Sequence, residues 1–259
     1  MKIAVCVKQV PDTWAEKKLR ADDSTLDRES ADGVINELDE YAIEEGLQLI
    51  EKHGGELVIV TMGPERAAES VRKALSMGAD SAIHLVDDSL HGSDALATSY
   101  ALAKVLEGRG FDLILFGSES TDARMSVLPA MVAERLGLAQ VTFAQKVDVD
   151  GGAISVQRVT EYGYDTVNAK LPAVVSVVEK INEPRYPSFK GIMAAKKKPV
   201  ETLSAADAGL DGSAVGQGAA WSAVADFAER PARAAGVVVT DEGDGGVKIA
   251  EHLSAQKLI

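Results

Sequence analysis

A polar segment at residues 117–126 has residue types that can bind a phosphate group. Its sequence, Gly-Ser-Glu-Ser-Thr-Asp-Ala-Arg-Met-Ser, follows a short apolar run and precedes a helical pattern. The first turn of a helix leaves backbone N–H groups free to point at an anion. Hydroxyl side chains add further donors, and the guanidinium of Arg124 matches phosphate geometry. Polar loops that cap a helix also occur without any ligand, so a purely structural role stays open as the alternative.

The rest of the sequence holds no recognisable catalytic or metal-binding set. The histidines are scattered and none forms an HxH or HxxxH pair, which is typical of structural histidines. The one cysteine, Cys6, falls within a strand pattern, where an inert buried thiol is expected. Walker, GxGxxG and GxSxG motifs are all missing. We therefore predict no catalytic residues and no metal site.

The composition narrows the classes of function. The chain has 259 residues, enough for one α/β core with an extension. Its formal net charge of −13 argues against nucleic acid as a partner, because phosphate backbones need a basic surface. No apolar run approaches the roughly 20 residues of a transmembrane helix, and the chain starts on a strand pattern rather than a secretory signal. We therefore expect a cytoplasmic protein.

Strand and helix patterns alternate along the first half of the chain. Apolar runs of strand type are separated by segments with helical spacing, such as the run from Leu38 to Ile50 that stops at Gly54-Gly55. The expected strands are 3–7, 57–61, 81–86 and 113–116, and the expected helices are 38–50, 64–77, 93–106 and 131–136. This order predicts a parallel sheet covered by helices on both faces. Ligands of such sheets bind beyond the carboxyl ends of the strands, where the polar segment lies.

The pattern changes after residue 141. Alternating residues around Asp148-Val-Asp-Gly-Gly152 predict a β-hairpin with strands at 142–149 and 153–160, and a strand at 171–178 closes this region. From residue 212 the chain is rich in Gly and Ala, and it ends in a short helical pattern at 247–253. We therefore divide the chain into an α/β domain, residues 1–211, and a C-terminal arm, residues 212–259.

The stretch after the last predicted strand has the character of a docking surface. It breaks at Asn182-Glu183-Pro184 and leads through two aromatic residues to three consecutive lysines. Exposed apolar side chains beside a cationic run are typical of a partner site on an acidic protein. The candidate contacts in this recognition loop, residues 185–198, are Phe189, Ile192, Met193, Lys196, Lys197 and Lys198. The alternative is that its aromatic side chains pack back onto the core.

Several of these motifs resemble the β subunit of electron transfer flavoproteins. Leu-Pro-Ala-Val-Val-Ser at 171–176, followed by Asn-Glu-Pro-Arg-Tyr at 182–186, is similar to the signature of that family. The resemblance begins at Lys2-Ile-Ala-Val-Cys-Val-Lys-Gln-Val10, includes Ala74-Leu-Ser-Met-Gly-Ala-Asp80 and weakens in the arm. It implies an α/β, Rossmann-like, adenine-nucleotide-binding fold: a parallel sheet flanked by helices, with an added β-hairpin region and an extended C-terminal arm.

The resemblance also implies two nucleotides. In that family one FAD is held mainly by the α subunit, and the β subunit holds an AMP of structural role. Thr13 corresponds to the part that approaches the isoalloxazine ring. The chain keeps Asp122 of the phosphate loop but lacks the second acidic residue and the glutamine of the common pattern, which leaves the phosphate contacts open. Carried over by position, the AMP contacts are Cys6, Asn36, Glu37, Leu38, Asp39, Met62, Gly117, Ser118, Glu119, Ser120, Thr121, Asp122, Ala123, Arg124, Met125, Ser126, Val127 and Leu128.

The implied partners are those of an electron carrier in fatty acid β-oxidation rather than an enzyme. They are an α subunit, acyl-CoA dehydrogenases and related flavoenzymes that donate electrons, and a membrane quinone oxidoreductase that accepts them. Phe189 would anchor the dehydrogenase, and the arm would pack on the α subunit through Trp221, Val224, Phe227 and Val237–Val239. Two alternatives stay open. One is an electron-bifurcating flavoprotein with a second FAD in the AMP site, and the other is a nucleotide-binding sensor without catalysis.

Overall fold

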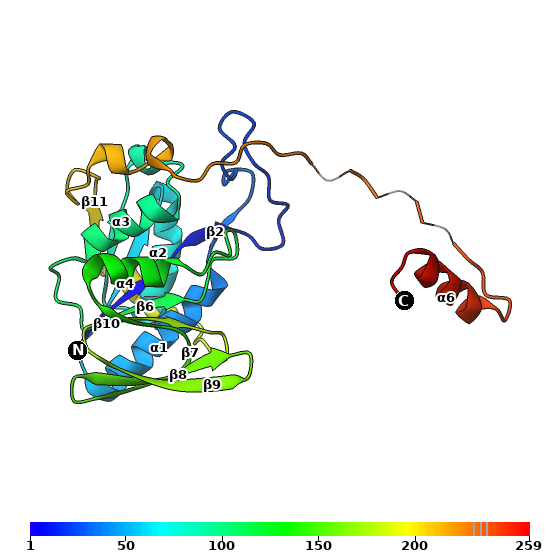
Figure 1. Ribbon diagram of the computed structural model, residues 1–259. Coiled ribbons are helices and arrows are strands. Elements are labelled where there is room, and N and C mark those ends of the chain that lie inside the picture. The colour runs from blue at the N-terminus through cyan, green and yellow to red at the C-terminus, as the bar shows by residue number, and fades with distance from the viewer. Residues whose placement is uncertain (230, 234, 237) are drawn as a thin grey trace. The chain divides into compact units, whose positions relative to one another are not determined.

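The computed structural model describes residues 1–229, 231–233, 235–236 and 238–259, in two compact units, Met1–Ala225 and Asp226–Ile259. The first unit is built on a nine-stranded sheet of order β11-β5-β4-β1-β6-β10-β7-β8-β9 (Figure 1). Its strands are β1 (Lys2–Cys6), β4 (Glu56–Met62), β5 (Ser81–Leu85), β6 (Leu113–Gly117), β7 (Ala139–Asp150), β8 (Ala153–Thr160), β9 (Gly163–Lys170), β10 (Ala173–Val177) and β11 (Val200–Leu203).

The sheet is parallel from β11 to β7 and antiparallel from β7 to β9. The central strands β6 and β10 are buried along their whole length, which fits their continuous apolar sequences because both faces of a parallel sheet are covered. The predicted α/β fold with a mostly parallel sheet and helices on both faces is confirmed.

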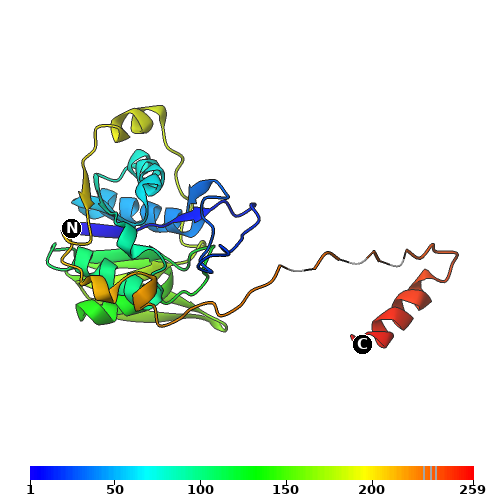
Figure 2. The same cartoon turned by 90° about the horizontal axis from the view of Figure 1, so that it is seen from above.

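Helices cover both faces of the sheet (Figure 2). Side chains alternate along β1, so that Ile3 and Val5 pack with Ile43 of α1 on one face, while Ala4 packs with Leu102 of α3 on the other. α2 lies on the α1 face and α4 on the α3 face. The helices of this unit are α1 (Glu37–His53), α2 (Ala68–Met77), α3 (Ala95–Leu106), α4 (Leu128–Leu136) and α5 (Phe189–Ala195).

The sequence analysis missed four strands. β9 is mostly exposed and is held by pairing with β8, so it lacks the buried apolar residues that mark a strand. β11 is short and pairs at the edge with β5. A separate two-stranded ribbon joins β2 (Gln9–Pro11) to β3 (Gly33–Ile35) at the base of a long loop that the sequence indicated only as polar. These strands depend on long-range partners rather than on their own pattern.

The strand predicted at 171–178 has a different place from the one expected. β10 does not close the hairpin region, because it lies between β6 and β7 in the parallel part of the sheet. The predicted hairpin is present as β7 and β8. The polypeptide therefore leaves the parallel sheet at β7, forms the antiparallel extension and returns to the centre through β10, which is where the signature segment begins.

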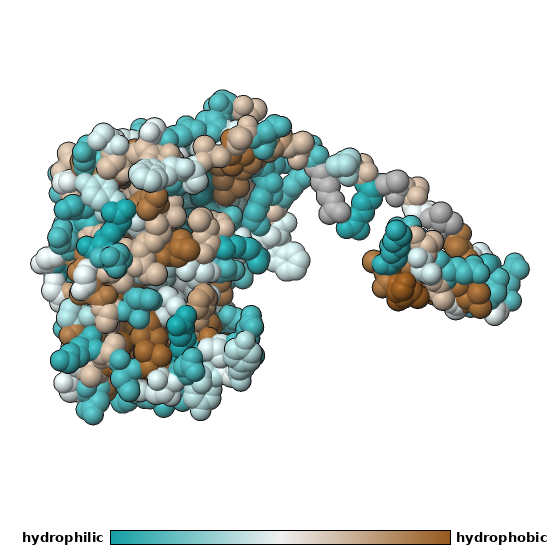
Figure 3. Space-filling model, viewed as in Figure 1, coloured by the Kyte–Doolittle hydropathy of each residue, from teal (hydrophilic) through white to brown (hydrophobic). Residues whose placement is uncertain are grey.

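Residues 211–225 belong to the first unit, although the sequence analysis began the arm at residue 212. Val215 is buried with the apolar residues of the α3 face, and the amide of Asp211 donates to the Tyr100 hydroxyl at 3.2 Å. The second unit contains α6 (Gly245–Ala255), which confirms the predicted terminal helix. Val247 and Ile249 are exposed on α6. Figure 3 shows apolar surface on this second unit.

Candidate functional site

The sheet order brings the predicted nucleotide segments to one edge. β4, β1 and β6 are neighbours, so the residues that follow their carboxyl ends meet beside the first turn of α1. Glu37, Leu38 and Asp39 open α1, Gly117 ends β6, and Leu128 opens α4. The segment between Gly117 and Leu128 is called the nucleotide loop below.

Asn36 joins the nucleotide loop to α1. Its side chain is fully buried, and Nδ2 donates to the Glu119 carbonyl at 2.9 Å. Its Oδ1 accepts from the Thr121 amide at 3.1 Å. The side chain makes no hydrogen bond that caps its own helix. Asn36 therefore fixes the loop against the helix at two backbone positions.

Asp39 and Gly117 are in close contact under this loop. Asp39 Oδ2 accepts from the Lys8 amide at 2.8 Å. Burial raises the pKa of Asp39 to about 7, although hydrogen bonds from Asn36 and from the Lys8 amide oppose this shift. A Cβ atom on Gly117 would lie 2.5 Å from Asp39 Oδ1 and 2.7 Å from the Leu38 carbonyl oxygen. Only glycine fits at the end of β6 without a shift of backbone.

Asp122 is the charged centre of the loop. Its side chain is 1% exposed, and its carboxylate lies 2.8 Å from both Lys8 Nζ and an Arg28 guanidinium nitrogen. Lys8 Nζ also donates to Ser120 Oγ at 3.3 Å. Burial alone would raise the pKa of Asp122, but the charge and hydrogen bond of Lys8, with the charge of Arg28, hold it at about 2. Two cations therefore face this one carboxylate.

The sequence analysis did not assign Arg28, and Lys8 appeared in it only within the stretch Lys2–Val10 that resembles the family. The Lys8–Asp122 contact joins residues 114 positions apart, and Arg28 lies in a polar loop without any motif. A lysine directly after a buried strand was the one local signal available. The predicted cation Arg124 is mostly exposed, and its closest carboxylate in the described residues is Glu119, at 3.9 Å.

Two buried hydroxyls at this edge have no hydrogen-bond partner among the described residues. They are Thr61 Oγ1, near the carboxyl end of β4, and Thr121 Oγ1, in the nucleotide loop. Unpaired buried hydroxyls are costly and point to a missing partner. Cys6, at the end of β1, is buried, and burial raises the pKa of its thiol well above the usual range, which removes it as a nucleophile.

Thr13 lies in the long loop between β2 and β3. Its hydroxyl donates to Glu37 Oε1 at 3.2 Å, which places it beside the first residue of α1. Its neighbour Trp14 is 95% exposed. Of the two methionines among the predicted nucleotide contacts, Met62 is half-buried and Met125 is exposed.

The predicted recognition loop contains a short helix, α5, that presents apolar side chains. Phe189 is 81% exposed, and Ile192 and Met193 are about half exposed, at 46% and 49%. The hydroxyl of Ser188 accepts from the Gly191 amide at 3.0 Å and caps the helix. The alternative of aromatic packing on the core does not hold for Phe189. Whether this surface binds a partner stays a prediction.

The two ends of the recognition loop are held on the core. Arg185 donates to both carboxylate oxygens of Glu44, from Nε at 2.7 Å and from Nη2 at 3.0 Å. Lys198 Nζ donates to carbonyls at the end of α2, including that of Leu75 at 2.9 Å. Lys196 and Lys197 are exposed, so they are the members of the cationic run that remain at the surface. Lys198 instead closes the carboxyl end of a helix.

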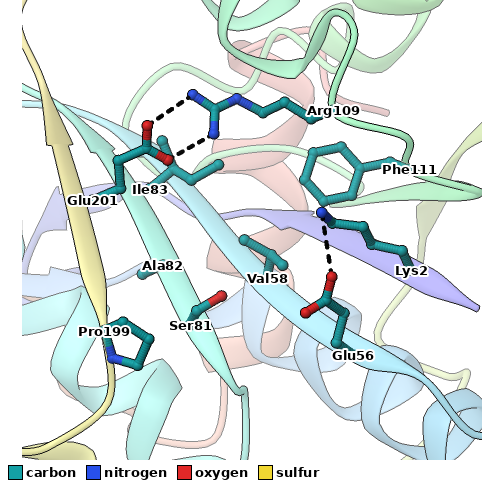
Figure 4. A pocket seen from close by; sticks show the side chains of 10 residues that line it. All are labelled: Lys2, Glu56, Val58, Ser81, Ala82, Ile83, Arg109, Phe111, Pro199 and Glu201. Carbon is teal, nitrogen blue, oxygen red and sulfur yellow. Dashed lines mark hydrogen bonds and ion pairs between the residues drawn. The ribbon is translucent and has the colours of Figure 1, made fainter.

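One cavity of about 330 Å³ lies at the opposite, amino ends of β1, β4 and β5 (Figure 4). Lys2 Nζ is 3.2 Å from Glu56 and 5.2 Å from the centre of the Phe111 ring. Arg109 pairs with both oxygens of Glu201, at 2.6 Å and 3.2 Å. Because these charges satisfy one another, the cavity offers fewer free groups than the carboxyl-end edge.

The described residues also bear on other classes of function. They contain no group of three or more acidic, histidine or cysteine side chains that could hold a metal ion. None of their helices is long and apolar enough to cross a membrane.

Known proteins similar to this chain share one description. A family model described as the electron transfer flavoprotein domain matches residues 23–208. The electron transfer flavoprotein subunit beta of Mycobacterium leprae is 53% identical over 263 residues, covering 99% of each chain. The Mycobacterium tuberculosis protein of that name is 52% identical with the same coverage, and the Megasphaera elsdenii protein is 36% identical over 271 residues, covering 100% of each chain.

Proposed function

The chain belongs to the electron transfer flavoprotein family as a β subunit, and we propose that it pairs with an α subunit to carry electrons on one FAD. The FAD accepts electrons from acyl-CoA dehydrogenases and related flavoenzymes and passes them to a membrane quinone oxidoreductase. On this proposal the chain is a cytoplasmic carrier subunit without catalytic residues of its own. It holds AMP, supplies one side of the flavin site and docks the dehydrogenase.

The observation that carries the AMP assignment is the edge formed by Asn36, Asp39 and the nucleotide loop. A phosphate needs donors and positive charge, and Lys8, Arg28 and the hydroxyl of Ser120 bring such groups together at Asp122. The unpaired hydroxyl of Thr121 adds a donor that has no use within the described chain. The residues present therefore fit a nucleotide monophosphate, whose role here is to hold these loops together.

The residues fit FAD only as one wall of its site. Thr13 and the exposed Trp14 can line one side of a ring, but nothing else in the loop encloses it. The FAD, when bound, supplies the one- and two-electron chemistry of the complex. The part of this chain would be to position the loop that carries Thr13 and to limit access of water to the ring.

Nucleotide content tests the AMP assignment. Acid release from the co-purified heterodimer is expected to give about one AMP and one FAD. Two FAD and no AMP would instead support the bifurcating flavoprotein, and a homo-oligomer without flavin would support the nucleotide sensor.

A matched pair of variants tests the residues. Thr121→Val should lower AMP content without lowering the stability of the nucleotide-free chain, because the hydroxyl has no partner to lose. Ser70→Ala removes an equally unpaired buried hydroxyl on α2, away from the loop, and should leave AMP content unchanged. Equal AMP content in both variants would show that the Thr121 hydroxyl does not bind AMP.

Docking of the dehydrogenase is proposed to depend on Phe189. A large exposed apolar side chain can dominate a small interface, with about 2 kcal/mol or more lost on truncation. Phe189→Ala should therefore slow electron transfer from the dehydrogenase about 30-fold or more at limiting concentration, with unchanged FAD content and thermal stability. Tyr162→Ala, at a similarly exposed aromatic on the β8–β9 turn, is the control and should have no effect. Lys196 and Lys197 would steer the encounter, so charge removal there should flatten its salt dependence.

The arm is proposed to pack on the α subunit through exposed apolar residues. Trp221, Val224 and Phe227 near its start are exposed, as are Val238 and Val239, whereas Val237 lies outside the described residues. A truncation after Leu210 would remove buried Val215 and damage the first unit. The sharper cut is after Ala225, the end of that unit. This truncation should weaken heterodimer formation and leave the first unit folded. Undiminished co-purification with the α subunit would show that the residues after Ala225 do not hold the two subunits together.

A further inference from the structure

Residues 12–32, called the strap below, form a long loop with internal order (the blue loop beside β2 in Figure 1). The β2–β3 ribbon closes its base, and the Asp12 amide donates to the Asp32 carbonyl at 2.9 Å. Farther from the base, Leu19 and Leu26 form an isolated antiparallel β-bridge. The strap is a shaped element, but it contributes no residue to either apolar core, so its position depends on polar contacts at its surface.

The first of these contacts is at the nucleotide loop. Arg28 reaches out of the strap to Asp122 at 2.8 Å. Asp122 is the buried carboxylate that Lys8 also holds, so it is fixed in place whether or not Arg28 is present. Because Asp122 is buried, solvent screens this ion pair less than one between two exposed side chains, although Asp122 Oδ2 accepts no hydrogen bond among the described residues.

The second contact lies at the tip of the strap. Asp23 Oδ2 is 2.8 Å from His91 Nε2, in the loop between β5 and α3. The backbone carbonyl of Asp23 accepts from the Gln217 side chain, Nε2, at 2.8 Å. The backbone amide of Gln217 donates to the His91 carbonyl at 2.8 Å. Glycine at position 92 allows this close contact, because the Cβ of any other residue there would lie 2.6 Å from the Gln217 side chain. The tip is thus hydrogen-bonded to the loop between β5 and α3 and to Gln217, near the end of the first unit.

We infer that Arg28 and His91 are positioning residues that hold the strap, and with it Thr13 and Trp14, against the flavin. This rests on the proposed function, since the place of the flavin beside Thr13 comes from it. One contact lies at the tip of the strap and the other on its returning limb, so together with the Thr13–Glu37 hydrogen bond they restrict a loop that has no residue in either apolar core. Asp122 belongs to the nucleotide loop and also pairs with Arg28 of the strap. The position of the strap at the flavin therefore depends on the conformation of the nucleotide loop.

The strap offers a matched control for Arg28. Arg20 has the same side-chain exposure, 38%, but its carboxylate at 2.9 Å is Asp22, which lies within the strap itself. Arg20→Gln therefore removes an equal charge and a similar ion pair without cutting a tie to the rest of the chain. Arg28→Lys keeps the charge at Asp122 and serves as the conservative variant.

The experiment measures hydrogen–deuterium exchange of strap peptides and the visible circular dichroism of the flavin in the co-purified heterodimer. Arg28→Gln and His91→Ala should each speed exchange in residues 12–32 about tenfold and change the flavin signal, while exchange in β1 and β6 stays as in the wild type. Arg20→Gln should change neither measurement, and Arg28→Lys should restore most of both.

Each other result contradicts the inference at a defined point. Wild-type exchange in the strap of Arg28→Gln would show that the strap is held by something else. Faster exchange with an unchanged flavin signal would show that the ties exist but do not position the flavin. The exchange measurement does not depend on which nucleotide is bound, so it stands even if AMP is absent from the heterodimer. A loss of protection throughout β1 and β6 that Arg28→Lys does not reverse would assign Arg28 to folding rather than to positioning.

Discussion

Replacement of Arg185 by alanine should destabilise the first unit and free the start of the recognition loop. Glu44, on α1, is 5% exposed at its side chain, and Arg185 supplies two side-chain hydrogen bonds to it at 2.7 Å and 3.0 Å. Burial alone would raise the pKa of Glu44, and the hydrogen bonds from Arg185 and Gln48 hold it below the usual range. Loss of the guanidinium therefore leaves a buried carboxylate with too few donors.

The loss of stability in Arg185→Ala depends on the hydrogen-bond donors that Glu44 keeps. Breaking a buried ion pair by removing one partner costs about 3–5 kcal/mol. Here Gln48 still donates to Glu44 at 2.9 Å, the backbone amide of residue 185 stays at 3.2 Å, and the guanidinium is partly exposed. We therefore expect a loss of about 2–3 kcal/mol in the free energy of unfolding for Arg185→Ala. The outer pair with Glu51 is more exposed and contributes less than about 1 kcal/mol.

Urea-induced unfolding of the chain at pH 7, followed by circular dichroism, measures this loss, and Glu51→Gln is the control. A double-mutant cycle with Glu44→Gln isolates the cause, because without the charge the Arg185→Ala change should cost less than about 1 kcal/mol. The folded-state pKa of Glu44 is lowered, so the stability it contributes is present above its unfolded pKa and lost as the pH falls through the folded value. The gap between the wild type and Arg185→Ala should therefore shrink in acid.

Two results would refute this reasoning. One is an Arg185→Ala chain within about 0.5 kcal/mol of the wild type at pH 7, the scatter of ordinary surface substitutions. The other is an Arg185→Ala change that lowers the free energy of unfolding by the same amount in the wild type and in the Glu44→Gln variant. That result would show that the loss comes from packing of the arginine stem rather than from the buried charge.

Three further predictions concern single residues of the site and its supports. Gly117→Ala should lower the free energy of unfolding by about 2 kcal/mol or more and reduce AMP content, because the added Cβ would lie 2.5 Å from Asp39 Oδ1 on α1. A thermal melt and a nucleotide assay measure these effects, and wild-type values in both would contradict the prediction. The pKa of Asp39 is raised to about 7, so the folded chain binds its proton more tightly than the unfolded chain. The free energy of unfolding should therefore fall between about pH 4 and pH 7, and Asp39→Asn should flatten that slope in urea titrations. Lys198→Met should cost about 1–2 kcal/mol through the lost helix-end contacts, whereas Lys196→Met should cost less than about 0.5 kcal/mol; equal melting temperatures would show that Lys198 is not a structural residue.

The α/β architecture was predictable because its signal is local. Continuous apolar runs such as Leu113–Phe116 and helical spacing such as Leu38–Ile50 follow from burial on both faces of a sheet and on one face of a helix. The order of these elements then limits the topology. β9 was missed for the same reason, since a strand exposed on most of its residues carries no burial pattern and exists only through pairing with β8.

The family was also determined by the sequence, because its motifs are contiguous and in order. The segments expected to bind the nucleotide do meet at one edge, as the parallel sheet requires, although their ligand stays a proposal. Within that edge the sequence placed weight on Arg124, which is exposed, and did not assign Arg28, which holds Asp122. A side chain's direction depends on the loop conformation around it, which residue type alone does not determine.

The roles of individual charges were decided only by the tertiary structure. Three consecutive lysines read as one cationic surface, yet Lys198 is committed to the carbonyls at the end of α2 and only Lys196 and Lys197 remain exposed. Val215, in a Gly- and Ala-rich stretch, is buried on the α3 face. Sequence patterns record the average environment of a segment, whereas an ion pair or a buried contact joins single atoms from distant segments. The sequence therefore determined the fold class and family, and the folded chain determined which side chains meet.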